Sequence, residues 1–144
     1  MGDSSIGQLI RDLLARRGEE AERVTRDIGG REALAAMAAM FTIAVERQFG
    51  DAADPAAVSR FVSDVRARYP NGYQVDQVLA EALVRAALGE EELLEGLDMN
   101  SAGAVETFLA TAIIDSKRYS NAELEDFIHE AEDFALQGLR EISE

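Results

Sequence analysis

Residues 33–45 read ALAAMAAMFTIAV, the most apolar run of the chain, in which Thr42 is the single polar residue. Apolar residues recur here at helical steps of three or four, as Leu34, Ala38, Phe41, Val45 and Phe49 on one face and as Met37, Met40, Ile43 and Ala44 elsewhere. The pattern predicts a helix over residues 31–49 that is apolar nearly all round and is covered by its neighbours. It is too short to cross a bilayer, which takes roughly 20 such residues.

The segments before this helix predict an N-terminal arm. Residues 5–17 place their aliphatic side chains on one face of a helix, and residues 19–28 form a second, weaker amphipathic pattern. Gly29 and Gly30 then interrupt the chain. We expect residues 1–30 to pack on the core or to swap onto the core of a second copy.

The segments after the central helix predict further amphipathic helices joined by short turns. Asp54 followed by Pro55 is a helix start, because Asp caps free amides and Pro needs no donor in the first turn. Ser120 and Glu123 have the spacing of a capping box at the start of the last helix. No stretch alternates with period two. The sequence therefore predicts one all-α domain over residues 1–144, a bundle of about six to seven helices around residues 31–49.

Composition and charge limit the function classes. The chain has 144 residues, no cysteine and a net charge of −14, and from Leu88 onward fifteen acidic residues stand against three basic ones. Such a field repels phosphate backbones, so we expect no direct nucleic-acid binding. The N-terminus is amphipathic and contains Asp3, unlike a signal peptide. We expect a cytoplasmic protein without membrane contact, and the excess of arginine over lysine suggests a bacterial, GC-rich genome.

Candidate chemistry centres on the single histidine. His129 has acidic residues three and four positions away on both sides, among them Asp126 and Asp133, so these three are weak candidates for a metal site or a pH-sensitive patch. The second histidine of an HExxH or di-iron site is missing. We interpret the region as a solvated acidic face. No nucleophile, phosphate-binding or cofactor motif occurs, so we expect no catalytic residue, metal or cofactor.

Three hypotheses of function remain open. The first is a protein-protein interaction module without catalytic activity that self-associates, as a homodimer, through Met37, Met40 and Phe41, because methionine adapts to irregular surfaces. The second is an acidic decoy or inhibitor of a nucleic-acid-binding protein, acting through the carboxylates between Glu90 and Glu144. The third is a small-molecule binder or enzyme with a pocket between helices around Met37, Phe41, Phe108 and Phe127.

Overall fold

The central helix is α3 (Gly30–Phe49) in the computed structural model of the chain, within one residue of its predicted bounds. The structure describes residues 5–15, 30–50, 54–69, 72–98 and 101–143. Its other helices are α1 (Ser5–Leu14), α4 (Pro55–Arg68), α5 (Gln77–Ala87), α6 (Ala102–Lys117) and α7 (Asn121–Ser143), with the short 3-10 helices η1 (Gly72–Gln74) and η2 (Glu91–Leu94). No strand occurs within these described ranges, so the predicted all-helical class is confirmed. The helix predicted over 19–28 lies outside the described residues.

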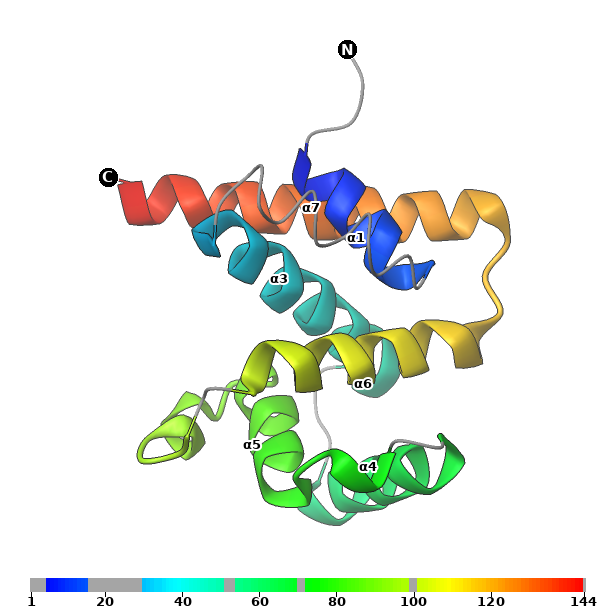
Figure 1. Cartoon of the computed structure of the whole chain (residues 1–144), viewed down its shortest axis with the longest axis vertical. Helices are drawn as coiled ribbons and strands as arrows, with labels where there is room; N and C mark the ends of the chain where they lie inside the picture. Colours follow the sequence, from blue (N-terminus) through cyan, green and yellow to red (C-terminus); the bar gives the residue numbers. More distant parts are fainter. Residues whose placement is uncertain (1–4, 16–29, 51–53, 70–71, 99–100, 144) are drawn as a thin grey trace.

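The helices are arranged around α3 (Figure 1). α6 and α7 run in opposite directions, and α3 crosses between them and packs against both. α1 lies across α3 and α7 on one side and packs against both. On the other side of α6 stand α5 and α4, which pack against each other and against α6. α3 therefore has neighbours on most of its circumference.

Burial along α3 follows from this arrangement. Ala36, Met40 and Ala44 are fully buried, and the many alanines of this helix let the neighbouring helices approach closely. Leu34 differs from the predicted stripe, because it lies in the first turns of α3 with 60% of its surface exposed. No helix of the described ranges combines the length and the apolar character that a bilayer crossing needs.

Side-chain caps fix where several helices begin. The Asp54 carboxylate accepts a hydrogen bond of 2.8 Å from the Ala57 amide at the start of α4. At α7, the Ser120 amide donates to Glu123 at 2.9 Å and the Glu123 amide donates to the Ser120 hydroxyl at 3.1 Å. Both predicted helix starts are confirmed. Asp76, whose carboxylate caps α5 through the amides of residues 78 and 79, is a further cap that the sequence analysis missed.

Arg47 connects the C-terminal end of α3 to the α6–α7 connection. Its guanidinium lies 5.6 Å from the ring centre of Tyr119 and 5.2 Å from that of Phe127, donates to the Tyr119 hydroxyl at 3.1 Å and pairs with Glu130 at 2.7 Å. The Lys117 ammonium donates to the Arg47 carbonyl at 3.1 Å. These contacts hold the start of α7 against the end of α3.

Candidate functional site

A groove of about 430 Å³ is lined by residues from α3, α5, η2, α6 and α7. Its walls are apolar and come from four of these elements, as Phe41, Leu83, Leu94 and Phe134. Three carboxylates also line it, Glu46 from α3, Glu91 from η2 and Glu106 from α6, and the lining is completed by Thr42, Ala86 and Ala87. We call this site the acidic groove. Its volume lies in the range of cavities that hold small ligands or inserted side chains.

Glu106 is the least exposed carboxylate of the acidic groove. It is half-buried and lines the groove together with apolar side chains, and within the described part of the chain no hydrogen bond or ion pair reaches its carboxylate. Burial raises the pKa of Glu106 to about 7, because the charged form loses hydration that no partner replaces. Near neutral pH this carboxyl group therefore exchanges between its protonated and ionised forms.

Glu46 and Glu91 are exposed at the edges of the acidic groove. The nearby cation of α5, Arg85, is already engaged, because its guanidinium makes two hydrogen bonds of 2.8 and 2.9 Å to Glu90. None of the described residues that line the groove carries a positive charge. The site thus combines apolar walls with negative charge that has no counterpart among its own lining residues.

Apolar residues continue along α3 from the groove. Leu34, Met37 and Phe41 stand three and four residues apart on one side of this helix, and their exposure differs, because Leu34 is 60% exposed, Met37 is half-buried and Phe41 is 2% exposed. Gly103 of α6 lies beside Leu34 and Met37, and a Cβ atom built on it would lie 3.4 Å from the Met37 sulfur. At the other side of the groove, Phe134 of α7 is 46% exposed. Exposed apolar side chains therefore occur on both α3 and α7, the helices that supply Phe41 and Phe134 to the groove.

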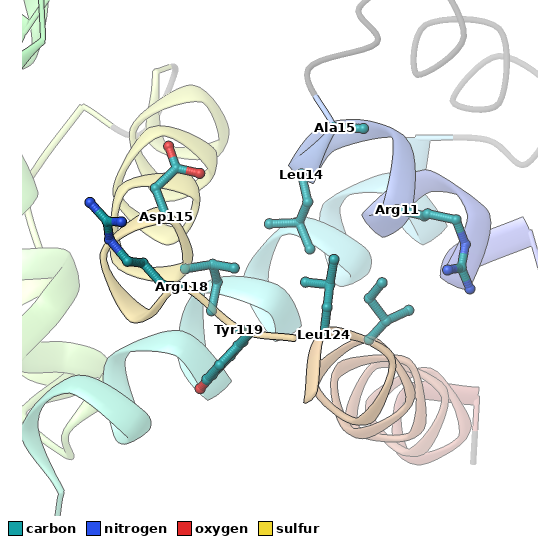
Figure 2. Close-up of a pocket in the computed structure, with 9 residues that line it drawn as sticks. Arg11, Leu14, Ala15, Asp115, Arg118, Tyr119 and Leu124 are labelled. Atoms are coloured by element: carbon teal, nitrogen blue, oxygen red, sulfur yellow. The ribbon is translucent and has the colours of Figure 1, made fainter. Parts of the chain in front are cut away.

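A second cavity, which we call the α1 cleft, lies between the end of α1 and the α6–α7 connection and also measures about 430 Å³. In Figure 2, Leu14 and Leu124 point toward each other into the cleft, whereas the charged ends of Arg11, Asp115 and Arg118 point away from its centre. Arg11 pairs with Glu125, and Asp115 accepts a hydrogen bond of 3.4 Å from the Tyr69 hydroxyl. The α1 cleft presents apolar side chains, with its charged groups at the margin.

The structure separates the residues that the sequence analysis singled out. Met40 and Phe41 have 0% and 2% of their surface exposed, so their bulk belongs to the core, and Met37 is half-buried beside exposed Leu34. The residues of the hypothesised pocket have different surroundings: Phe41 lines the acidic groove, Phe108 packs against Tyr69 at a ring distance of 5.4 Å, and Phe127 is fully buried.

His129, Asp126 and Asp133 are exposed on the outer side of α7, away from its buried stripe. In the ranges that the structure covers, no three His, Cys, Asp or Glu side chains converge as a metal ion would require. In the described part of the molecule, His129 therefore belongs to no cluster of side chains that could hold a metal ion.

Glu106 is the site residue that the sequence analysis missed. The chain offers a signal for it, because Glu106 is the only charged residue between Ser101 and Ile114. A lone carboxylate inside an apolar helical stretch indicates partial burial. The second half of the site, the apolar wall from α5, η2 and α7, is not visible from any local pattern.

Comparison of the chain with protein-family models, with curated proteins and with solved structures gave no match.

Proposed function

We propose that this chain is a helical interaction module without catalytic activity, and that it recognises a basic protein through the acidic groove. The observation that carries the proposal is the groove itself, an open cavity that combines apolar walls with three carboxylates and, among the described residues that line it, no cation. A partner that supplies positive charge on an apolar surface satisfies both properties of the site.

The charge distribution supports a basic partner. Of the net charge of −14, −12 falls on residues 88–144, the part of the chain that supplies η2, α6 and α7 to the groove. A field of one sign accelerates the encounter with an oppositely charged protein. The apolar walls then supply affinity that salt does not screen, because burial of Phe134 and its neighbours removes apolar surface from water.

Self-association, the other form of the interaction hypothesis, is less well supported. In a symmetric dimer the same surface meets itself, so an interface centred on the groove brings two sets of acidic side chains together. Leu34, Val78 and Phe134 are the large apolar side chains that are exposed in the described ranges, a small apolar area for an obligate dimer. Homodimerisation through the Met37 side of α3 stays a prediction.

The decoy hypothesis is a special case of the proposal. Proteins that bind nucleic acids present basic surfaces, and an acidic groove with apolar walls competes with the nucleic acid for such a surface. The proposal therefore covers an inhibitor of a nucleic-acid-binding protein, in the cytoplasmic compartment that the sequence predicts, without requiring that class of partner.

The experiment measures how the affinity for a captured partner depends on the charges of the groove. The chain is immobilised, bound proteins are isolated from the native cell, and the affinity of each purified protein is measured over a range of salt concentrations. The test variant is Glu46→Gln/Glu91→Gln, and the control is Asp126→Asn/Asp133→Asn, which removes the same charge from the exposed side of α7. We expect the test variant to weaken binding by about tenfold and to flatten its salt dependence. Equal effects of the two variants, or binding that is insensitive to salt, contradict the proposal.

A further inference from the structure

The three carboxylates of the acidic groove are not equivalent. Glu46 and Glu91 are exposed, whereas Glu106 is half-buried and faces the apolar walls. An exposed carboxylate attracts any cation weakly because water screens it. A carboxylate in an apolar cavity selects a cation that brings its own apolar surface, since that surface replaces water on the walls.

We propose that Glu106 receives the charged end of one lysine or arginine side chain of the partner, and that the methylene stem of that side chain packs against the exposed ring of Phe134. This inference rests on the proposed function, because it names the group by which the basic partner is anchored. Long cationic side chains place their stems on apolar surface and keep their charged ends at a polar group. The groove offers that combination, because buried Phe41, exposed Phe134 and the half-buried Glu106 of α6 line the same cavity.

Anchoring at Glu106 couples binding to pH. The titratable groups that share the groove with Glu106 are Glu46 from α3 and Glu91 from η2, while α5 contributes Leu83 and two alanines and α7 contributes Phe134. An inserted cation favours the ionised carboxylate, so it lowers the pKa of Glu106 from about 7 and displaces a proton when it binds at or below that pH. Affinity for the cation therefore rises as pH increases through about 7 and falls below it.

The test uses n-hexylammonium as a probe, because it reproduces a lysine stem with its charged end. The carboxyl carbon of Glu106 is followed by NMR in the ¹³C-labelled chain and is assigned with Glu106→Gln. Hexan-1-ol, of similar length without charge, is the matched control probe. We expect hexylammonium to lower the pKa of Glu106 by about one unit or more and to bind more tightly at about pH 8 than at about pH 6. Hexanol should do neither.

Two variants extend the test. Glu106→Gln should remove the pH dependence of hexylammonium binding, while Phe134→Ala keeps the carboxylate and should weaken binding by removing one wall. Because Phe134 is 46% exposed, its replacement leaves the core in place. The inference is overturned if hexylammonium shifts the Glu106 signal no more than hexanol does, or if Phe134→Ala binds the probe as tightly as the parent chain.

The outcomes separate this inference from the proposed function. If the affinity for a basic partner is lowered by Glu46→Gln/Glu91→Gln and is unchanged by Glu106→Gln, the proposed function is upheld and the anchoring role of Glu106 is overturned. Hexylammonium binding at Glu106 in a chain that binds no basic protein upholds the anchor site and overturns the function.

Discussion

The acidic groove and the α1 cleft have the same volume, about 430 Å³ each, and both combine apolar side chains with charged ones. They differ in what the charged groups do. In the α1 cleft, Arg11 forms an ion pair with Glu125, and Asp115 accepts a hydrogen bond from the Tyr69 hydroxyl. In the groove, Glu106 has no partner among the described residues. Cavity size therefore does not distinguish the two regions. The difference is that the groove contains a half-buried carboxylate without such a partner, whereas Arg118, the remaining charged residue of the α1 cleft, is exposed to water.

Both regions lie on α7, which makes the comparison direct. The first turns of α7 supply Leu124 and Ile128 to the α1 cleft, and its middle supplies Phe134 to the groove. Ile128 is 2% exposed and Phe134 is 46% exposed. The same helix thus contributes a core residue to one cavity and a surface residue to the other, so we expect the α7 side of the α1 cleft to be a packing feature and the α7 side of the groove to be available to a partner.

The largest expected effect is a difference in stability loss when Ile128 and Phe134 are each replaced by alanine. Ile128→Ala should lower the free energy of unfolding by about 2–4 kcal/mol, because it leaves a hole in a buried site. Phe134→Ala should lower it by less than about 1 kcal/mol, because water already reaches that ring. Urea unfolding followed by circular dichroism measures both values. Equal losses would contradict the distinction between a structural cleft and an open groove.

The second prediction concerns the pH dependence of stability. In the folded chain the pKa of Glu106 is about 7, above its ordinary value, so the folded state holds a proton that the unfolded state releases between about pH 4.5 and 7. Stability therefore decreases as pH rises through this window. Glu106→Gln cannot ionise and should be more stable than the parent by on the order of 2 kcal/mol at about pH 8, with little difference at about pH 5.

The matched control for this prediction is Glu46→Gln, which removes an exposed carboxylate from the same groove. We expect it to change the free energy of unfolding by no more than about 0.5 kcal/mol at either pH. Thermal unfolding over a series of pH values tests both variants. If Glu106→Gln follows the parent at every pH, then burial does not perturb this carboxyl group and the groove loses its difference from the α1 cleft.

A smaller effect is expected at the capping box beside the α1 cleft. Ser120→Ala removes the hydroxyl that accepts a hydrogen bond from the Glu123 amide. This change should lower the free energy of unfolding by about 1 kcal/mol. The backbone amide of Ser120 also lowers the pKa of Glu123, so the cap weakens as acid protonates that carboxylate. NMR of the variant should show changes near Tyr119 and Leu124 and none near Phe134. Changes that reach the groove would indicate that the two regions are coupled through α7.

The smallest expected effect is a gain. Gly138 lies inside α7, and a Cβ atom built on it meets no other atom within 4 Å. Gly138→Ala should raise the free energy of unfolding by about 0.5–1 kcal/mol, because alanine loses less backbone entropy in a helix. The variant touches neither the α1 cleft nor the groove, so the melting temperature should rise with hexylammonium binding unchanged. A lower melting temperature would show that α7 is strained at this residue.

Much of the fold follows from local patterns. The Asp54–Pro55 pair and the Ser120–Glu123 box mark helix starts because both devices act within one helical turn. The apolar run around Met40 identifies the central helix, since a helix apolar nearly all round has to be covered. The exposure of Leu34 was not predictable, because it depends on where neighbouring helices end and not on the sequence of α3.

The candidate site was much less accessible from the sequence. Its lining comes from five elements spread over residues 41–134, so it exists only after the helices have packed. Burial raises the pKa of Glu106, and burial depends on the surroundings of a residue and not on its type. His129 was a candidate because of its residue type, and the structure shows that it is exposed. A lone charge in an apolar stretch is the local feature that points to the groove, and it gives no indication of the opposite wall.

The position of α3 between α1, α5, α6 and α7 also has a consequence for how the molecule opens. Backbone amides along the buried part of this helix can exchange hydrogen for deuterium only when those neighbouring helices separate. Such a separation is equivalent to global unfolding. Residues such as Met40 and Ala44 should therefore exchange most slowly, at a rate that reports the stability of the entire fold. Partner binding at the groove, which joins five of its elements, should slow that exchange further even where no partner atom touches α3.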